Sequence, residues 1–440
     1  MTFTLRRRQF AGVAAVLAAT LVTSTACSGD GNDNASGNNS NTGGTIELTV
    51  DTFGNFGYNA LFKQYEAAHS NIKIKPRNVV RLDDYTPRLQ QWLAAGSGAG
   101  DVVALEEGIL VQFKNQSDKF TNLLDHGAAS MQGNFLDWKW ELGKAKDGKL
   151  IGLGTDIGPL GMCYRTDLFE KAGLPTDRDE VSKLWSDWNA FIDTGKKFAA
   201  ANTGAKFIDG ANAQFNTVLI QEAGKSLGYT YFDKDDKLVF DSNPAIRTAF
   251  DTVVRMMQEG LSANLASFTP EWAAGFKQGS FAALACPSWM LGIIEDNAGA
   301  DGKGLWDVAA VPGGGGYWGG SWLAVPSQSK HQAEAADLVK FLTSPESQLA
   351  AYEAANTFPS TTKFYKDAAI TEHKDDYFNE APVGKIFGEG AEQVKPVYLG
   401  EKNQNVRQEV ENVLLAIGQG SLSPDQAWQR AIDAAKSAAR

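Results

Sequence analysis

Aromatic rings recur beside carboxylates and amides where this chain is expected to end a strand or to form a loop. The residues concerned are Asn55, Phe56, Glu107, Asp156, Trp289, Tyr317, Trp318 and Trp322. Rings pack on flat faces of C–H groups, whereas carboxylates, amides and indole N–H groups fix the orientation of hydroxyls. A neutral oligosaccharide has both features and would suit this set. Each residue also has a structural alternative, because a ring can belong to the core, and Asn55 or Glu107 can form a turn or cap a helix.

Short motifs that could indicate catalysis or metal binding are incomplete. Glu106 and Glu107 could be the two carboxyls of a glycosidase, but adjacent residues of a continuing strand face opposite ways. The Ser-x-x-Lys spacing at 327–330 has no companion motif, and 224–226 lacks the preceding glycine of a phosphate loop. A calcium-like start at 233–235 leads to Lys237, where an oxygen ligand belongs. We expect no catalytic residue, no metal and no cofactor, with a secreted carbohydrate-active enzyme as the alternative.

The elements that must position these residues alternate between strands and helices. Alternating apolar and polar residues predict a strand at 45–52, and further strands are expected at 72–77 and, as a short buried run, at 101–105. Helical spacing predicts helices at 60–69 and 85–95. This order is typical of a parallel sheet covered on both faces. Because ligands bind beyond the carboxyl ends of such strands, segments 54–58 and 106–108 are the expected edges of a site. A hairpin is expected at 231–240, and helices dominate from residue 334 onward.

Composition limits the classes of function. The chain has 440 residues and a formal net charge of −11, and removing residues 1–26 takes away three arginines and no acids, which gives −14. This charge argues against a nucleic-acid partner, whose phosphates require a positive face. The length suffices for two domains with separate cores. Cys163 and Cys286 could pair outside the cell, or remain as two buried thiols.

The first 44 residues are typical of export and anchorage. Three arginines at 6–8 precede an uncharged apolar run of 13 residues at 10–22. That run is too short to span a bilayer, so residues 1–26 are predicted to be a signal peptide. The Arg-Arg-Gln-Phe order resembles a twin-arginine signal. Cys27 lies where a bacterial lipoprotein carries its lipid, although Ser24 replaces the usual Leu, and residues 27–44 are the expected lipidated cysteine and flexible tether. An ordinary secretory signal is the alternative.

A family likeness extends over residues 45–440. It is carried by four ordered blocks, at 147–174, at 279–289, at 319–346 and at 358–360, including the stretches Tyr-Arg-Thr-Asp-Leu-Phe-Glu-Lys-Ala-Gly-Leu and Gly-Ser-Trp-Leu-Ala-Val. These blocks resemble those of the extracellular sugar-binding proteins of ABC importers, the maltose-binding-protein-like family. The resemblance implies an α/β, two-lobed periplasmic-binding-protein fold of type II with the ligand in the interlobe cleft. Lobe 1 would comprise 45–152 plus 314–356 and lobe 2 would comprise 153–313 plus 357–440, with crossovers near 151–157, 311–316 and 356–360.

The resemblance also implies a function. Trp272 lies where related proteins often place a platform ring. The protein would capture sugar by hinge closure and deliver it to ABC permease subunits, as a monomer held at the extracellular face of the membrane by its lipid. Residues 51–58 are similar to those of actinobacterial binding proteins for cellobiose and cello-oligosaccharides. Xylo-, chito- and malto-oligosaccharides, a peptide or another solute remain alternatives.

Overall fold

The structure is a computed structural model that describes residues 44–440, which form one compact unit. The predicted signal peptide and the predicted lipid anchor at Cys27 lie outside the described residues. Two separate sheets organise the unit.

The first sheet continues the pattern predicted from the sequence. It has five strands in the order β2-β1-β3-β9-β4, namely β1 (Ile46–Phe53), β2 (Ile72–Val79), β3 (Val102–Glu106), β4 (Leu153–Gly154) and β9 (Ser321–Ala324). β1 is parallel to β2 and β3, as expected, whereas β9 is antiparallel to β3 and β4. The sheet is therefore mixed, because β9 returns from a distant part of the chain.

The second sheet has four strands in the order β6-β7-β5-β8. They are β5 (Leu160–Arg165), β6 (Lys206–Ile208), β7 (Phe281–Pro287) and β8 (Trp306–Ala310). β5 is antiparallel to β7 and β8, and β6 is parallel to β7. The central strands β5 and β7 are buried along their whole length, which fits a sheet covered on both faces.

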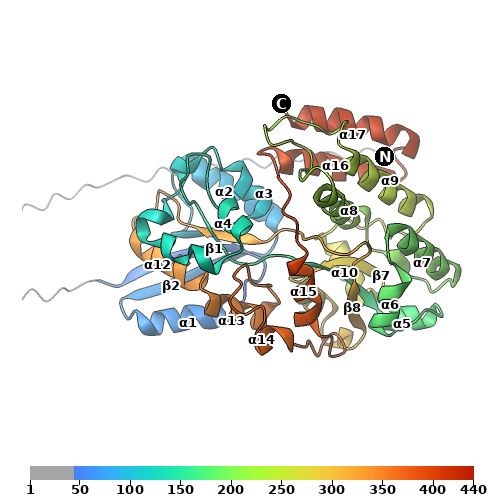
Figure 1. Cartoon of the computed structure of the whole chain (residues 1–440), viewed down its shortest axis with the longest axis horizontal. Coiled ribbons are helices and arrows are strands. Elements are labelled where there is room, and N and C mark those ends of the chain that lie inside the picture. Colours follow the sequence, from blue (N-terminus) through green and yellow to red (C-terminus); the bar gives the residue numbers. More distant parts are fainter. Residues whose placement is uncertain (1–43) are drawn as a thin grey trace, which may run out of the picture. The chain divides into compact units, whose positions relative to one another are not determined.

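Helices surround each sheet (Figure 1). Around the first sheet they are α1 (Asn59–Ala68), α2 (Leu82–Ala95), α3 (Glu107–Gln112), α4 (Asp137–Leu142), α12 (Gln332–Leu342) and α13 (Pro345–Ala355), with short 3₁₀ turns η1 (Ser117–Lys119), η2 (Leu123–His126) and η3 (Ala128–Asn134). The remaining elements are α5 (Thr166–Lys171), α6 (Arg178–Leu184), α7 (Trp188–Ala200), α8 (Ala211–Lys225), α9 (Pro244–Gln258), α10 (Pro270–Gln278), α11 (Met290–Ala298), η4 (Ala300–Gly302), α14 (Ala368–Thr371), α15 (Val383–Glu392), α16 (Asn403–Gly418) and α17 (Pro424–Ala438). None of these described helices has the length and apolarity needed to cross a membrane.

The alternation along β3 explains why the first sheet is covered on both faces. Val102 and Ala104 pack in one core with Leu48, whereas Val103 and Leu105 pack in a second core with Tyr85. Successive side chains of a strand point to opposite faces, so each strand contributes to both cores. Burial on both faces leaves the ends of the strands as the places where polar side chains meet.

The two cysteines whose state was open from the sequence form a disulfide. Cys163 of β5 is bonded to Cys286 of β7, 123 residues away in sequence, and both side chains are fully buried. The bond links neighbouring strands in the centre of the second sheet.

The chain passes between the sheets in three segments. The first lies between β4 and β5, the second between β8 and β9, and the third follows α13. Isolated bridges join Asp156 to Pro359 and Pro159 to Tyr317, so the crossing segments lie side by side. The predicted lobe boundary after residue 152 falls just before β4, which pairs with β9 of the first sheet.

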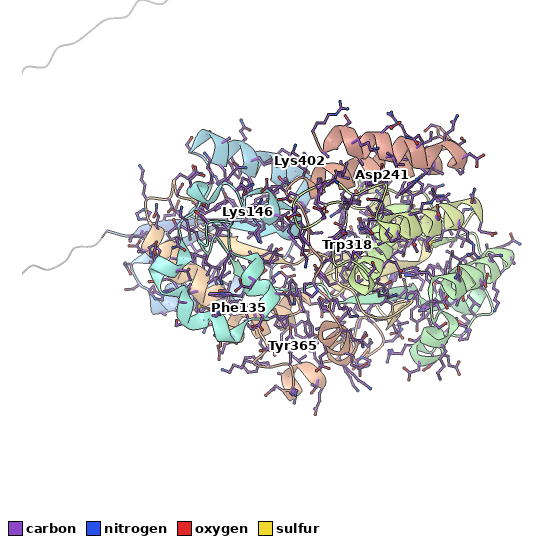
Figure 2. The ribbon with its side chains drawn as sticks, turned by 45° about the horizontal axis from the view of Figure 1, so that its top comes forward. Phe135, Lys146, Asp241, Trp318, Tyr365 and Lys402 are labelled. Carbon is purple, nitrogen blue, oxygen red and sulfur yellow. A yellow bond between two sulfur atoms is a disulfide. The ribbon has the colours of Figure 1, made fainter. Side chains whose placement is uncertain are left out.

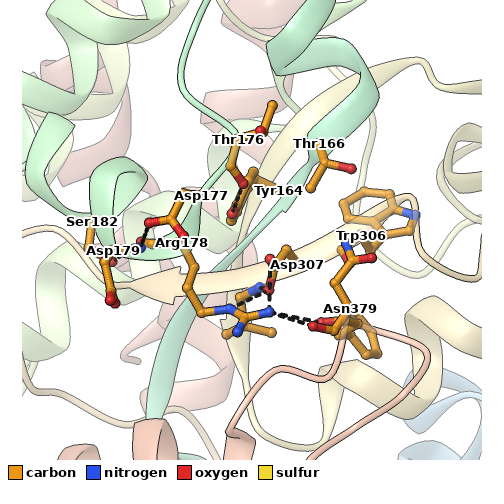
Figure 3. A network of polar contacts seen from close by, with 12 residues as sticks. Tyr164, Thr166, Thr176, Asp177, Arg178, Asp179, Ser182, Trp306, Asp307 and Asn379 are labelled. Carbon is orange, nitrogen blue, oxygen red and sulfur yellow. Dashed lines mark hydrogen bonds and ion pairs between the residues drawn. The ribbon is translucent and has the colours of Figure 1, made fainter.

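A polar network fixes α6 to the edge of the second sheet (Figure 3). Arg178 donates from Nε and Nη2 to the two carboxylate oxygens of Asp307 at 2.9 and 3.1 Å, and from Nη2 to the carbonyl of Asn379 at 2.7 Å. Asp177 caps α6 by accepting from the backbone N–H groups of Asp179 and Glu180. The polar groups of this network form hydrogen bonds with one another, so we interpret the network as structural.

Candidate functional site

The carboxyl end of β3 delivers two acidic side chains to one place. The strand ends at Glu106, whose Oε2 accepts from the N–H of Gly108 at 2.7 Å and so caps α3. Glu107 is the first residue of α3 and is only 4% exposed. Because the strand stops here, the two carboxyls do not face opposite ways as they would on a continuing strand, and both line one cavity.

That cavity lies where elements of both sheets meet. Its volume is about 40 Å³, and it is lined by Glu106, Glu107, Gly108, Asn216, Leu219, Ile220, Thr230, Tyr231, Trp318, Gly319, Leu399, Asn403 and Arg407. The first three follow the first sheet, Trp318 and Gly319 belong to the second crossing segment, and the rest belong to α8, α16 and the segments around 230 and 399. Figure 2 shows Trp318 near the middle of the molecule's described part. Ligand pockets are commonly about 300–1,000 Å³, so a sugar unit needs these walls to be further apart.

Burial makes the two carboxyls unusual acids. It raises the pKa of Glu107 to about 8, against the opposing effect of Lys139, while the neighbouring Glu106 raises it further. Burial also raises the pKa of Glu106, with Arg407 acting in the other direction. Tyr317 donates from its hydroxyl to Oε1 of Glu107 at 3.1 Å. The first-sheet wall therefore presents two buried carboxyls of raised pKa.

A buried lysine supports this wall. Lys139 of α4 is fully buried, and its Nζ lies 3.3 Å from the ring centroid of Trp322. Its ammonium has no hydrogen-bond partner among residues 44–440. Burial lowers the pKa of Lys139 to about 8, and Asp156 and Glu107 oppose that shift. Lys139 was not among the site residues predicted from the sequence, although a lysine between Trp138 and Trp140 is an unusual position for a charge.

The opposite wall is held by a carboxylate on α16. Glu411 accepts from Nε of Arg407 at 2.9 Å and from Nδ2 of Asn216 at 2.8 Å. Burial acts to lower the pKa of Arg407, but Glu411 and Glu106 raise it above its ordinary value. The guanidinium carbon of Arg407 lies 5.6 Å from the ring centroid of Trp318. This wall therefore presents a fixed cation beside an aromatic ring.

A second polar pair lies beside this cation. Asn403, at the start of α16, accepts from the hydroxyl of Thr230 at 3.0 Å. The sequence analysis missed the polar residues of this wall, because they lie within helices or beside a hairpin and do not follow a strand. One sequence signal could have indicated these residues. The helix α8 has a buried face that includes the polar residues Gln214, Asn216 and Thr217 among apolar neighbours.

Some predicted site residues come together at or beside the cavity. Glu107 and Trp318 line it, and Tyr317 is bonded to Glu107. Trp289 donates from Nε1 to the carbonyl of Trp318 at 3.1 Å, and the two rings meet edge to face. Asp156 accepts from the N–H of Ser321 at 3.0 Å, at the junction of the first two crossing segments.

The other predicted residues lie elsewhere. Asn55 is exposed and accepts from the N–H of Gly57 at 3.0 Å, as a turn residue does, and Phe56 packs beside Phe53. Trp272 donates to Asp209 at 2.8 Å within a core, and Trp322 donates to the carbonyl of Lys139 at 3.2 Å within another. These four do not line the cavity.

Metal binding finds no support in the arrangement of potential ligands. Within the described range 44–440, no group of three or more His, Cys, Asp or Glu side chains is placed to hold a metal ion.

Comparison with known proteins gives concordant results. The profile of the family described as bacterial extracellular solute-binding protein matches residues 60–378. The arabinooligosaccharide-binding protein of Bacillus subtilis is 24% identical over 419 residues, which cover 88% of this chain and 91% of that protein. The lactose-binding protein of Rhizobium radiobacter is 26% identical over 256 residues, covering 57% of this chain and 56% of that protein.

Solved structures match the fold. A crystal structure described as an extracellular solute-binding protein of family 1 is 41% identical, has a TM-score of 0.78, and covers 90% of this chain and 100% of its own. An ABC-transporter-associated binding protein from B. animalis subsp. lactis, in complex with β-1,6-galactobiose, has a TM-score of 0.76 at 19% identity, covering 89% of this chain and 98% of its own. The expected two-lobed α/β fold of type II is confirmed.

Proposed function

Because this chain belongs to the family of bacterial extracellular solute-binding proteins, we propose that it captures oligosaccharides outside the cell for an ABC importer. The observation that carries the proposal is the cavity between the two sheets. Carboxyl acceptors stand on one side of it, and a guanidinium, amides and a hydroxyl stand on the other, beside the ring of Trp318. The relatives named for arabinooligosaccharide, lactose and β-1,6-galactobiose support a sugar as the ligand.

The proposed mechanism is binding and closure without chemistry. Since the cavity has only about 40 Å³, the ligand enters when the lobes are apart and is enclosed when they approach. The three crossing segments are the proposed hinge, and Asp156 lies within the first of them. Contacts from both walls then stabilise the closed form, which the permease subunits recognise.

Two substitutions test the binding site. Trp318→Ala removes the ring, and Glu107→Gln replaces the carboxyl by an amide of similar shape. Each should weaken sugar binding about tenfold, or about 1.4 kcal/mol. Trp92→Ala is the control, because Trp92 is a half-buried ring beside Arg77 on the first lobe, away from the cavity. Isothermal titration calorimetry on residues 28–440 gives the affinities, and thermal unfolding checks the fold. Unchanged affinity in both cavity variants would contradict the proposed site.

For the particular sugar we propose cellobiose and short cello-oligosaccharides. The support is the likeness of residues 51–58 to proteins that bind these sugars. The rings of Trp272 and Trp322 lie in cores and add nothing to this support, whereas Trp318 lines the cavity. A calorimetric screen of cello-, xylo-, chito- and malto-oligosaccharides, with lactose, ranks the alternatives.

An enzymatic role is the competing proposal, since Glu106 and Glu107 line one cavity. We propose that the protein is not an enzyme. Incubation with the same oligosaccharides should return them intact by chromatography, and release of shorter sugars would favour the enzyme.

Export and anchorage complete the proposal. The family description supports an exported protein, and we propose that Cys27 carries a lipid that holds a monomer at the extracellular face of the membrane beside its permease. Membrane fractionation tests the anchor: Cys27→Ala should move the protein from the membrane fraction to the soluble fraction while sugar affinity stays the same.

A further inference from the structure

One hydroxyl in the cavity wall has no hydrogen-bond partner in the described part of the chain. Tyr231 lines the cavity, is 1% exposed, and its hydroxyl makes no hydrogen bond to any of residues 44–440. Its ring is stacked on Phe240, with centroids 5.9 Å apart and planes 17° apart, so the hydroxyl is held in one direction. A buried polar group without a partner destabilises a protein by about 1–3 kcal/mol. Such a group therefore requires an explanation.

The surroundings of Tyr231 make its hydroxyl a hydrogen-bond donor. Burial and then the nearby Glu411 raise the pKa of Tyr231 far above its ordinary value, so the proton is retained. Arg407 is a second donor on the same wall. Its Nε is bonded to Glu411, which leaves the other edge of the guanidinium for a further acceptor. These two donors and the ring of Trp318 line one cavity.

The facing wall offers acceptors. Oε2 of Glu106 accepts one backbone N–H and Oε1 of Glu107 accepts the hydroxyl of Tyr317, but each carboxyl has further lone pairs. A sugar hydroxyl suits both walls, because its oxygen can accept a hydrogen bond from the donor wall while its hydrogen is donated to the acceptor wall. A carboxylate can only accept, so it has no hydrogen to donate to Glu106 on the facing wall.

We propose that Tyr231 and Arg407 donate hydrogen bonds to the oxygen of one sugar hydroxyl, and that the same hydroxyl donates its hydrogen to Glu106. With this arrangement the site selects neutral sugars and rejects acidic ones. This inference rests on the proposed function and names the ligand class of the same cavity. Uronic acids are rejected because their carboxylate has no hydrogen for Glu106 to accept, which is a form of selection against the wrong ligand.

A pair of phenylalanine variants tests the role of the hydroxyl. Tyr231→Phe removes only that group, and Tyr352→Phe is the matched control, because Tyr352 is fully buried, also has a hydroxyl without a partner among residues 44–440, and does not line the cavity. Tyr231→Phe should bind the best of cellobiose, xylobiose, chitobiose, maltose and lactose about 3- to 10-fold more weakly, while urea unfolding shows no loss of stability. Tyr352→Phe should match the parent in affinity.

The parent protein gives an independent measurement. Cellobiouronic acid and digalacturonic acid should bind at least about 100-fold more weakly than the best neutral disaccharide, which would be about 2.7 kcal/mol. Glu106→Gln should narrow that ratio. An acidic disaccharide that binds as tightly as the best neutral one, or a Tyr231→Phe variant with the parent's affinity, would overturn the inference while leaving sugar capture intact. If none of the sugars binds the parent, the proposed function and this inference both fall.

Discussion

At the residue scale, the buried carboxyls decide how the protein responds to pH. Asp209 is fully buried, accepts from Nε1 of Trp272 at 2.8 Å with one oxygen, and has no partner for the other among residues 44–440. Burial raises the pKa of Asp209 to about 6, and the bond from Trp272 only partly opposes this. The folded state therefore binds a proton that the unfolded chain, with an ordinary Asp, releases about two pH units lower.

The sign of the pH effect follows from this difference. Between about pH 4 and pH 6 the folded state holds more protons than the unfolded state, so the contribution of Asp209 to stability falls as pH rises. Above pH 6 the ionised carboxylate destabilises the fold by about 3 kcal/mol at most. Asp209→Asn should therefore be more stable than the parent at pH 8 by about 1–3 kcal/mol and similar to it at pH 4. Urea unfolding at the two pH values measures this.

Asp187 provides the control of opposite sign. It is an exposed N-cap of α7, and the backbone N–H groups of Ala190 and Asn189 lower its pKa. Asp187→Asn should lose stability near neutral pH and approach the parent in acid. If Asp209→Asn behaved like Asp187→Asn, the description of Asp209 as an uncompensated buried acid would be wrong.

The sequence could indicate some cavity residues and not others for physical reasons. Glu107 follows a short apolar strand that is visible in the sequence, so its position could be anticipated. Tyr231 and Arg407 belong to a hairpin and a helix that reach the cavity only through the packing of the second lobe. The rings of Trp272 and Trp322 satisfy their N–H groups inside cores, and residue type alone cannot distinguish that use from ligand contact.

At the scale of elements, the disulfide joins strands that the chain brings together from distant positions. It links β5 to β7 and closes a loop between two cysteines that are 123 positions apart in sequence. A bond that closes such a loop stabilises the fold mainly by restricting the unfolded chain. Replacing both cysteines by Ala should lower the free energy of unfolding by about 2–5 kcal/mol and leave sugar affinity unchanged, because neither residue lines the cavity.

Chemical reduction distinguishes the effect of the disulfide bond on stability from the effect of changing the two side chains. The parent unfolded in urea with a strong thiol reductant should lose about as much stability as the double variant. Reduced and oxidised parent proteins of equal stability would show that the bond contributes nothing to the fold.

Most strands and helices of the first lobe were predictable from the sequence, whereas the pairing of the strands was only partly predictable. The predicted strands at 45–52 and 101–105 correspond to β1 and β3 within one residue, because the first alternates apolar and polar residues and the second is a short apolar run. The antiparallel insertion of β9 was not anticipated, since register depends on a segment more than 200 residues away. The short helix α3 was also missed, because six residues carry too little periodicity.

At the scale of the whole molecule, a charged bridge joins the two lobes away from the hinge. Lys146 lies in a turn of the first lobe, and its Nζ is 2.8 Å from Oδ2 of Asp236 and 2.9 Å from Oε1 of Glu401 in the second lobe. Asn115 of the first lobe also donates to Glu401. Asp236 and Glu401 belong to segments that contribute Tyr231 and Asn403 to the cavity wall. The bridge therefore favours the approach of the two walls.

Removing the bridge should make closure less favourable. Because these charges are partly exposed, the expected effect of Lys146→Ala is about 0.2–1 kcal/mol, or up to about 5-fold weaker sugar binding at low salt. The difference should shrink in about 1 M salt, where the screening length is about 3 Å. Calorimetry at two salt concentrations measures the affinity, and small-angle X-ray scattering measures the radius of gyration, which should increase.

Lys144→Ala is the matched control, since Lys144 pairs with Glu141 inside the first lobe. It should leave both quantities at the parent's values. Equal affinity and equal radius for Lys146→Ala and the parent at low salt would exclude a role of the bridge in closure.

The two-lobed architecture was predictable from ordered blocks of sequence, each too weak alone. Contacts between the lobes were not, because they join residues as distant as Asn115 and Glu401, 286 positions apart. Such pairs leave no periodic trace in either segment.

The disulfide has a further consequence for biosynthesis. Both cysteines are wholly inside the folded unit, so an oxidising enzyme cannot reach them once helices cover the sheet. A chain that crosses the membrane unfolded meets the oxidising compartment with both thiols accessible. A chain that crosses folded, as a twin-arginine signal directs, arrives with its thiols already enclosed. The redox state of Cys163 and Cys286 in the exported protein therefore records whether folding came before or after passage across the membrane.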